Sequence, residues 1–349
     1  MIADLPAQTG GGAVELLRTS GLTKHFRLGG FLSHRHLHGV DSIELAINEN
    51  EIVALVGESG SGKSTIARLI AMIYKPTAGE IFHRGRPLSS MRSRRDVLEY
   101  RGRVPMVFQD PYGSLSPVYH VSHGIMRALK LHRTELSHRG REQEAEFLLE
   151  SVGLTPVRDF LAKYPYELSG GQRQRIGFAQ ALACRPELIL ADEPVSMLDV
   201  SVRIGVLNLM ASLRRRQRIS FLYITHDIAS ARYVADRIIV LYAGKVAESG
   251  PVEDVLAHPK HPYTQLLLSA VPDPRAPVSL PSSTEVHEAP RVIDPPEGCR
   301  FRTRCPYAID ECGRVTPALR TLRPNHEAAC HVATSDHEDS AELAQDRLN

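Results

Sequence analysis

The chain has 349 residues, of which 42% are hydrophobic and 23% charged, and its formal net charge is +2. This composition is ordinary for a globular protein, and the length accommodates one large domain with a smaller appendage. The balanced charge gives no overall case for nucleic-acid binding, and no segment approaches the roughly 18 unbroken apolar residues of a membrane span. Because the N-terminus lacks a secretion signal, we expect a cytoplasmic chain whose five cysteines are thiols or metal ligands.

Apolar strands alternate with helix-like stretches from about residue 16 to 250, which is typical of an α/β domain, after a flexible leader at 1–15. The clearest predicted strands are Glu51–Val56, Val104–Phe108, Leu188–Leu190, Ser220–Ile224 and Arg237–Leu241. The stretch Thr65–Tyr74 is predicted to be a helix, because apolar residues recur on one side of it. Those apolar positions are Ile66, Leu69, Ile70 and Ile73.

The strand pattern disappears from about residue 110 to 185, where Arg141–Ser151 has the composition of a helix. We predict a helical subdomain inserted there in the α/β core. Prolines are dense from Val271 to Pro296, which favours an extended linker. We assign residues 251–333 to a small C-terminal Cys-rich domain, and the polar, acidic residues 334–349 to a disordered tail.

The segment Gly57–Thr65 (GESGSGKST) matches the phosphate-loop pattern G-x-x-x-x-G-K-[ST] in full, between a strand and a helix. Its glycines let consecutive backbone amides face phosphates, and the helix N-terminus adds the positive end of its dipole. Lys63 is expected to reach the terminal phosphates and Ser64 to bind Mg²⁺. The predicted nucleotide contacts in this loop are Gly57, Ser59, Gly60, Gly62, Lys63, Ser64 and Thr65.

Two adjacent acids, Asp192 and Glu193, follow the apolar run Leu188–Leu190. Ligands of open parallel sheets bind at the carboxyl ends of the strands, which is where both acids are predicted to lie. Asp192 is expected to reach Mg²⁺ directly or through its water, and Glu193 to polarise the attacking water as general base. Two adjacent acids are usually surface charge, but their position after a complete phosphate loop favours catalysis.

The segment Leu168–Gln172 (LSGGQ) places a serine and two glycines at the start of a predicted helix, which makes an anion site. It resembles the signature sequence of ATP-binding cassette (ABC) ATPases. Gln109, Asp199 and His226 match the Q-loop, D-loop and switch-histidine positions of that family in order and spacing. The resemblance covers about residues 16–250 and implies an α/β P-loop NTPase (RecA-like) core.

In that family the signature of one subunit covers the nucleotide on the phosphate loop of another, so a second, related ABC ATPase subunit is implied. The implied signature contacts to ATP are Ser169, Gly170, Gly171 and Gln172. Gln109 would contact Mg²⁺ or water, His226 would hydrogen-bond the γ-phosphate, and Asp199 would bridge the dimer. Phe26 is in the region that stacks on adenine, although a phenylalanine in an N-terminal strand is often core. Met197 departs from the family, which usually has a small residue there.

Four segments resemble the ATPase subunits of dipeptide and oligopeptide importers: Val107–Pro117, Asp192–Arg203, His258–Pro272 and, closest of all, the Cys-rich piece Pro295–Cys330. The resemblance implies an ATPase on the cytoplasmic face of the membrane that energises peptide import, with nickel or another small solute as the alternative. The implied partners are two membrane-spanning permease subunits and, indirectly, an extracytoplasmic peptide-binding protein. Tyr112–Ser116 would lie near a membrane subunit.

Four of the five cysteines, Cys299, Cys305, Cys312 and Cys330, lie within 32 residues. Their gaps match neither the C-x-x-C zinc pattern nor the ferredoxin runs, and unrelated buried thiols are one interpretation. A segment this small usually needs a metal or a cross-link to fold. The resemblance to peptide-importer subunits implies a [4Fe-4S] cluster on these four thiolates, with Zn²⁺ as the second choice. His326 and His331 could substitute as ligands, although solvated loop histidines are the simpler interpretation.

Two other classes of function compete with transport. A cassette ATPase acting on DNA typically carries a long coiled-coil or zinc insertion, but here about a hundred residues without heptads separate phosphate loop and signature. A non-catalytic regulator would not need Glu193 and His226. We therefore predict an ATPase and no nucleic-acid partner.

Overall fold

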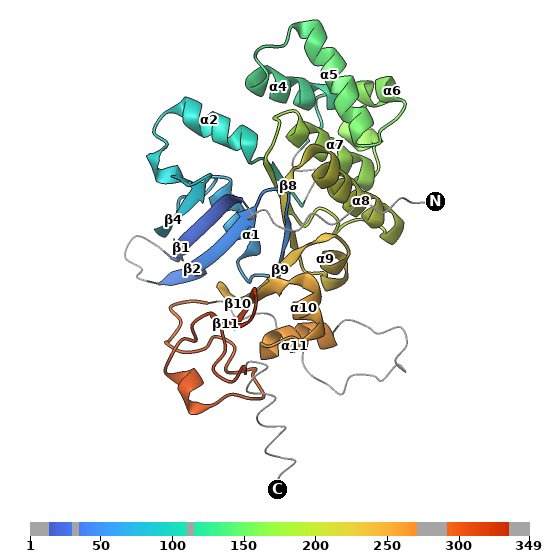
Figure 1. The fold of residues 1–349 in the computed structure, drawn as a ribbon. Coiled ribbons are helices and arrows are strands. Elements are labelled where there is room, and N and C mark those ends of the chain that lie inside the picture. The colour runs from blue at the N-terminus through green and yellow to red at the C-terminus, as the bar shows by residue number, and fades with distance from the viewer. Residues whose placement is uncertain (1–13, 30–34, 110–114, 271–291, 335–349) are drawn as a thin grey trace.

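The computed structural model describes residues 14–29, 35–109, 115–270 and 292–334 (Figure 1). The predicted leader, most of the proline-rich stretch, the tail from 335 and most of Tyr112–Ser116 lie outside these residues. Two sheets and a set of helices make up the described fold. In Figure 1 the N-terminal strands lie on one side, helices α4 (Val121–His132), α5 (His138–Ser151) and α6 (Val157–Ala162) at one end and the C-terminal segment at the other.

The first sheet is antiparallel and has the order β2-β1-β4-β5. Its strands are β1 (Glu15–Arg27), β2 (His36–Asn48), β4 (Ala78–His83) and β5 (Arg86–Pro87). Strand β1 pairs with β2 on one side and β4 on the other, with register shifts that bend it. Strand β2 is therefore an edge of this sheet.

The second sheet has eight strands in the order β11-β12-β10-β9-β3-β8-β7-β6. Its parallel part consists of β9 (Arg237–Tyr242), β3 (Ile52–Val56), β8 (Ser220–Thr225), β7 (Leu188–Asp192) and β6 (Met106–Val107). The antiparallel part consists of β10 (Lys245–Pro251), β12 (His326–Ala328) and β11 (Arg320–Arg323). All five strands predicted from the sequence are present, and the α/β fold class is confirmed.

Strand β3 shows why this sheet is buried on both faces. Ile52, Ala54 and Val56 pack into one hydrophobic core, while Val53 and Leu55 pack into the other. Every one of these side chains is fully buried, as expected for a parallel strand covered on both sides. The first core continues into the helical region, and the second lies against α1 and the antiparallel sheet.

The helices of the first half are α1 (Lys63–Ile70), the 3₁₀ turn Leu88–Ser90 and α2 (Arg94–Arg103). Between β6 and β7 lie α4 (Val121–His132), α5 (His138–Ser151), α6 (Val157–Ala162), the 3₁₀ turn Pro165–Glu167 and α7 (Gly170–Leu182). The remaining helices are α8 (Val200–Gln217), α9 (Ile228–Val234), α10 (Val252–Ala257), α11 (Pro262–Ser269) and the 3₁₀ turn Asp310–Gly313. Within residues 115–187 the structure describes helices and no strand.

Helix α1 is shorter than predicted. It ends at Ile70, and Met72 adopts a left-handed backbone with φ of 55°. The amides of Ile73 and Tyr74 then both donate to the carbonyl of Arg68, which closes the helix end. Ile73 is consequently 48% exposed instead of lying on the buried face.

The C-terminal segment is joined to the rest of the fold and does not stand apart as a domain. Strands β11 and β12 extend the main sheet, and Phe301 packs in the same core as Tyr263 and Tyr242. His326 is fully buried and its Nε2 lies 2.6 Å from Glu248 Oε1 of β10. The interpretation of His326 as a solvated loop residue is therefore wrong.

A search of the described helices for a long, apolar segment able to cross a membrane finds no candidate.

Candidate functional site: a phosphate loop at the edge of the main sheet

The phosphate loop joins β3 to α1 at the carboxyl edge of the parallel strands. Gly57 and Gly62 are required there, since a Cβ would lie 2.1 Å from the carbonyl oxygen of Leu241 and 2.4 Å from that of Gly39, respectively. Gly62 also has φ of 106°, which a side chain disfavours. The ammonium of Lys63 donates to the carbonyls of Gly57 (2.7 Å) and Glu58 (2.8 Å). The loop is thus curled around the lysine that it presents.

Ser64 and Asp192 lie side by side in this site. The Ser64 hydroxyl donates to Asp192 Oδ1 at 2.9 Å, which joins the start of α1 to the end of β7. Burial raises the pKa of Asp192, and the hydrogen bond from Ser64 and the charge of Arg68 work in the opposite direction. Burial likewise lowers the pKa of Lys63, while Glu193 and Asp192 counteract it. A hydroxyl and a carboxylate at this spacing are a donor set that suits Mg²⁺.

Glu193 is the centre of a second cluster. Gln109 Nε2 donates to its Oε2 at 3.1 Å, and His226 Nδ1 lies 3.3 Å from its Oε1. The backbone of Glu193 has φ of 44° and its amide donates to the carbonyl of Ile224 in β8, which fixes the turn that presents the carboxylate. Three residues that lie far apart in the sequence are thereby brought together at the ends of three parallel strands.

Most of these groups line one cavity of about 810 Å³, although Asp192 does not. Its polar lining comprises Ser59, Lys63, Ser64, Thr65, Gln109, Glu193 and His226, together with Gly60 and Gly62 of the loop and His38 and Gly39 of β2. Its apolar lining comprises Phe26, Leu28, Leu37, Val292 and Ile293. Phe26, predicted from the resemblance, does reach the cavity and packs edge-on against Tyr74. Four of these lining residues were not predicted from the sequence, because nothing in their local pattern marks them as site residues: Leu28, Leu37, Val292 and Ile293.

The signature residues and Asp199 do not line this cavity. Ser169 caps α7 by accepting a hydrogen bond from the amide of Gln172 (3.3 Å), and the Gln172 side chain accepts one from the Ser169 amide (2.9 Å). A Cβ on Gly171 would lie 2.2 Å from Val202 of α8, so this glycine is also needed for packing within the chain. The chain therefore presents a phosphate loop and a signature at separate places.

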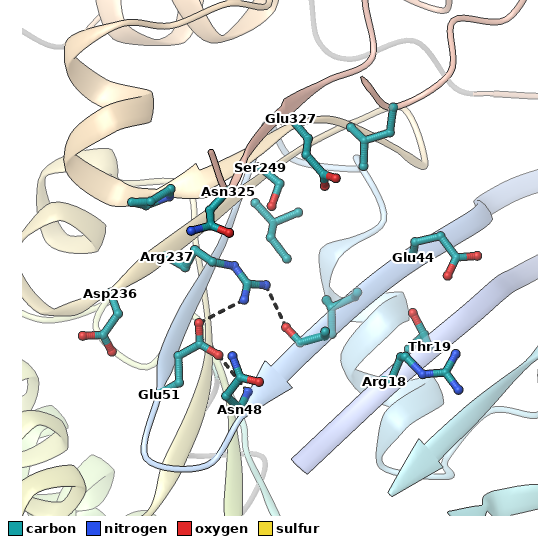
Figure 2. A pocket seen from close by; sticks show the side chains of 15 residues that line it. Arg18, Thr19, Glu44, Asn48, Glu51, Asp236, Arg237, Ser249, Asn325 and Glu327 are labelled. Carbon is teal, nitrogen blue, oxygen red and sulfur yellow. Dashed lines mark hydrogen bonds and ion pairs between the residues drawn. The ribbon is translucent and has the colours of Figure 1, made fainter. Parts of the chain in front are cut away.

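A second cavity, of about 590 Å³, lies at the opposite edge of the sheet (Figure 2). Arg237 bridges there between Glu51 (3.0 Å) and the carbonyl of Ala46 (2.8 Å). Glu51 and Arg237 stand at the amino ends of β3 and β9, whereas ligands of parallel sheets bind at the carboxyl ends. The hydrogen bond from Arg237 to Ala46 of β2 joins the two sheets, and we assign this cavity no part in the chemistry.

The C-terminal part of the chain also contacts the phosphate loop, and the sequence alone did not predict these contacts. The two terminal guanidinium nitrogens of Arg304, Nη1 and Nη2, each donate to one carboxylate oxygen of Glu58 at 2.9 Å, which makes a bidentate ion pair. The Tyr263 hydroxyl accepts from the Glu58 amide at 2.9 Å. Arg304 also lies over the rings of Tyr242 and Phe301. The second residue of the phosphate loop is thus tied to the residue that precedes Cys305.

Asp41 provides a second connection to this segment. It accepts hydrogen bonds from His38 (2.8 Å), His25 and Arg300, and Arg300 also donates to the carbonyl of Ala243. Burial would raise the pKa of Asp41, but the hydrogen bonds from His25, Arg300 and His38 outweigh it and hold the pKa well below its usual range. His25, His38 and Asp41 converge closely enough to hold a metal ion, but Arg300 already neutralises the carboxylate.

We expect Arg304→Gln to weaken ATP binding about tenfold, because Glu58 would then hold an uncompensated negative charge beside the phosphates. The matched control is Arg314→Gln, an exposed arginine of the same segment. Adding Glu58→Gln to Arg304→Gln should restore most of the affinity. Titration of full-length variants with a fluorescent ATP analogue measures this, and equal affinity of Arg304→Gln and Arg314→Gln would contradict the role of the ion pair.

The four C-terminal cysteines share one neighbourhood. Burial raises the pKa of Cys299, and nearby Cys312, Cys330 and Cys305 raise it further. Burial also raises the pKa of Cys330, and nearby Cys305 and Cys312 raise it further. Burial and nearby Cys312 likewise raise the pKa of Cys305. Every pair among the four is therefore close enough to interact. Cys184 lies elsewhere, and burial raises its pKa to about 11.

The fold and this loop define a P-loop nucleotide-binding protein, and comparisons with known proteins narrow the class. The family model described as ABC transporter matches residues 40–196, and that described as oligopeptide/dipeptide transporter, C-terminal region, matches residues 247–312. The chain is 41% identical over 319 residues to YkfD of Bacillus subtilis, which is named for oligopeptide transport ATP binding, covering 91% of this chain and 95% of YkfD. It is also 41% identical to the oligopeptide transport ATP-binding protein AppF of the same organism, covering 84% and 89% of the two chains.

Among solved structures, the dimeric ATP-binding cassette MJ0796 bound to ADP and Pi matches with a TM-score of 0.61 and 29% identity, covering 68% of this chain and 99% of that one. The chain therefore belongs to the ABC transporter family, among the ATP-binding subunits of oligopeptide and dipeptide transporters. This confirms the family expected from the signature and from the C-terminal segment. It also confirms ATP as the cofactor and transport-coupled ATPase as the class of activity.

Proposed function

We propose that this chain hydrolyses ATP in a site shared with a second ATPase subunit and thereby drives the import of peptides. The observation that supports this most directly is the division of the family's site residues within one chain. The phosphate loop, Glu193 and His226 line the cavity and Asp192 is hydrogen-bonded to Ser64 of that loop, whereas the signature lies elsewhere. A phosphate loop without its signature is half of the family's site, so completion by another subunit is required.

The residues of the cavity have separate roles in this proposal. Ser64 and Asp192 would hold Mg²⁺, which would supply positive charge to offset the phosphate oxygens. The amides of the phosphate loop and the ammonium of Lys63 bind those oxygens. Glu193 accepts the proton of the attacking water while Gln109 holds its other carboxylate oxygen. His226, whose side chain is 58% exposed, is free to turn toward the γ-phosphate.

The surface near the signature fits a second ATPase subunit. Met197, Val200 and Ile204 form an apolar patch at the start of α8, with exposed fractions of 67%, 71% and 44%. Asp199 is the N-cap residue of α8 and lies between Met197 and Val200 in the sequence. Exposed apolar side chains gathered in this way are typical of a protein interface. Ser169, Gly170, Gly171 and Gln172 would complete the site of that partner, and a methionine at 197 provides a larger dimer contact than a small residue does.

The transport partners follow from the family. Two membrane-spanning permease subunits would carry the peptide, and an extracytoplasmic peptide-binding protein would deliver it, so this chain would work at the cytoplasmic face of the membrane. Val118 and Tyr119, which follow the Q-loop, are 73% and 51% exposed. They offer an apolar surface to a permease.

We also propose that the four C-terminal cysteines hold a [4Fe-4S] cluster. A tetrahedral Zn²⁺ with Zn–S bonds of about 2.3 Å would place its sulfurs about 3.8 Å apart. Among the described residues no three cysteines have sulfurs within 4.8 Å of one another, although all four interact. This arrangement does not match the spacing of a single Zn²⁺, and the cluster is proposed from the resemblance of the C-terminal segment to peptide-importer subunits. Cys299, Cys305, Cys312 and Cys330 would be its ligands.

Uptake of labelled peptides by cells tests the transport function. Deletion of the gene should abolish uptake of dipeptides or oligopeptides, wild-type protein should restore it, and Lys63→Ala should not. Parallel measurement of nickel uptake distinguishes the alternative solute. Normal peptide uptake in the deletion strain, with loss of nickel uptake, would assign the chain to the nickel importers.

A further inference from the structure

Residues 292–294 lie along the edge of the nucleotide cavity and make one isolated β-bridge to β2. Leu37 and Ile293 form an antiparallel bridge at the free edge of β2. The amide of His38 donates to the carbonyl of Val292 (2.8 Å), and the amide of Asp294 donates to the carbonyl of His36 (3.1 Å). The Asp294 carboxylate also accepts from the His36 amide at 3.0 Å. Three hydrogen bonds thus fix a piece of the C-terminal segment beside β2.

This bridged segment contributes two apolar side chains to the cavity. Val292 is buried and Ile293 is half-buried, and both line the cavity together with Phe26, Leu28 and Leu37. The rest of the lining comes from the phosphate loop, Gln109, Glu193 and His226, and from His38 and Gly39 of β2, where His38 is hydrogen-bonded to Asp41. A nucleotide has the same division, with a charged triphosphate and a largely apolar aromatic base. With the triphosphate held at Lys63, the apolar side chains are left for the base.

We propose that Ile293 forms a wall of the base-binding subsite with Phe26 and Leu37, so that the C-terminal segment takes part directly in nucleotide recognition. Residue 293 lies about 40 residues beyond the end of β10, and only its pairing with β2 brings it to the site. Removing apolar surface from water on binding is favourable in proportion to the area covered. Ile293 makes no polar contact with a base, so it would raise affinity for adenine nucleotides without acting on the phosphates.

The test compares Ile293→Ala with Ile309→Ala in the full-length protein. Ile309 is 47% exposed, lies in the same C-terminal segment and does not line the cavity, so it controls for loss of an apolar side chain. Calorimetric titration with ATP and with inorganic triphosphate gives two dissociation constants for each variant. We expect Ile293→Ala to weaken ATP binding by about three- to tenfold and to leave triphosphate binding unchanged. Ile293→Leu, which keeps the volume, should stay near wild type.

Two results would overturn the proposal. ATP affinity equal in Ile293→Ala and Ile309→Ala would show that Ile293 does not contact the base. An equal loss of ATP and triphosphate affinity would show that the substitution disturbs the phosphate loop instead. Thermal unfolding of each variant shows whether it is folded. If Ile293→Ala is unfolded, the ATP and triphosphate affinities of Ile293→Leu and Ile293→Val are compared instead.

Discussion

Glu193→Gln is expected to lower ATP turnover by about 10²- to 10⁴-fold, the range typical of losing a general base. A glutamine keeps the size of the side chain and can still hydrogen-bond to Gln109, but it cannot accept a proton from water. ATP binding should survive, since Lys63, Ser64 and Asp192 are untouched. The protein should therefore accumulate as an ATP-bound dimer, visible as a larger species by light scattering while phosphate release stops.

The matched control for this prediction is Glu253→Gln, because Glu253 lies on the surface of α10 and pairs there with Arg232. It should retain wild-type turnover. Measurements are best made with the second ATPase subunit co-expressed, since the shared site requires it. Unchanged turnover in Glu193→Gln would refute Glu193 as the base, and loss of ATP binding would show that the carboxylate holds the loop together instead.

The parts of this site that the sequence predicts are those in which the chemistry resides in a short, continuous motif. The phosphate loop is complete within nine residues, and its strand–loop–helix context follows from the apolar run before it and the helical spacing after it. Asp192 and Glu193 follow a buried strand in the same manner. Parallel pairing of β7 with β8 and of β8 with β3 then brings the acids to the phosphate loop. The resemblance to the ABC family added Gln109 and His226, which no local pattern marks.

The contacts that sequence reasoning missed are all long-range. Arg304 and Glu58 are 246 residues apart, and Ile293 and Leu37 are 256 residues apart, so neither pair has a local signal. The same holds for His326, which looks like a loop residue until β12 pairs with β10 and buries it against Glu248. The assignment of residues 251–333 to a C-terminal domain did not foresee that β11 and β12 extend the main sheet, for the same reason. Proline density marks a break in regular structure, but it does not show whether the chain returns to the same sheet.

The proposed cysteine-bound cluster predicts the iron and sulfide content of the purified protein. Anaerobically purified protein should contain about four iron and four sulfide per chain, and Cys305→Ser should lose most of both. Cys184→Ser is the control, because Cys184 lies outside the cluster and should leave the iron content unchanged. Metal analysis separates the alternatives, since one zinc per chain without sulfide would establish a zinc site. A folded, iron-free wild-type protein would also contradict the cluster.

Loss of the cluster should extend to the nucleotide site. Arg300 follows Cys299 and binds Asp41, and Arg304 precedes Cys305 and binds Glu58 of the phosphate loop. A segment this short has few apolar contacts of its own, so metal ligation would supply much of what holds these two arginines in place. Cys305→Ser should therefore weaken ATP binding about as much as Arg304→Gln does. If iron is lost while ATP affinity stays at the wild-type value, the arginines are held by their own ion pairs and the cluster serves another purpose.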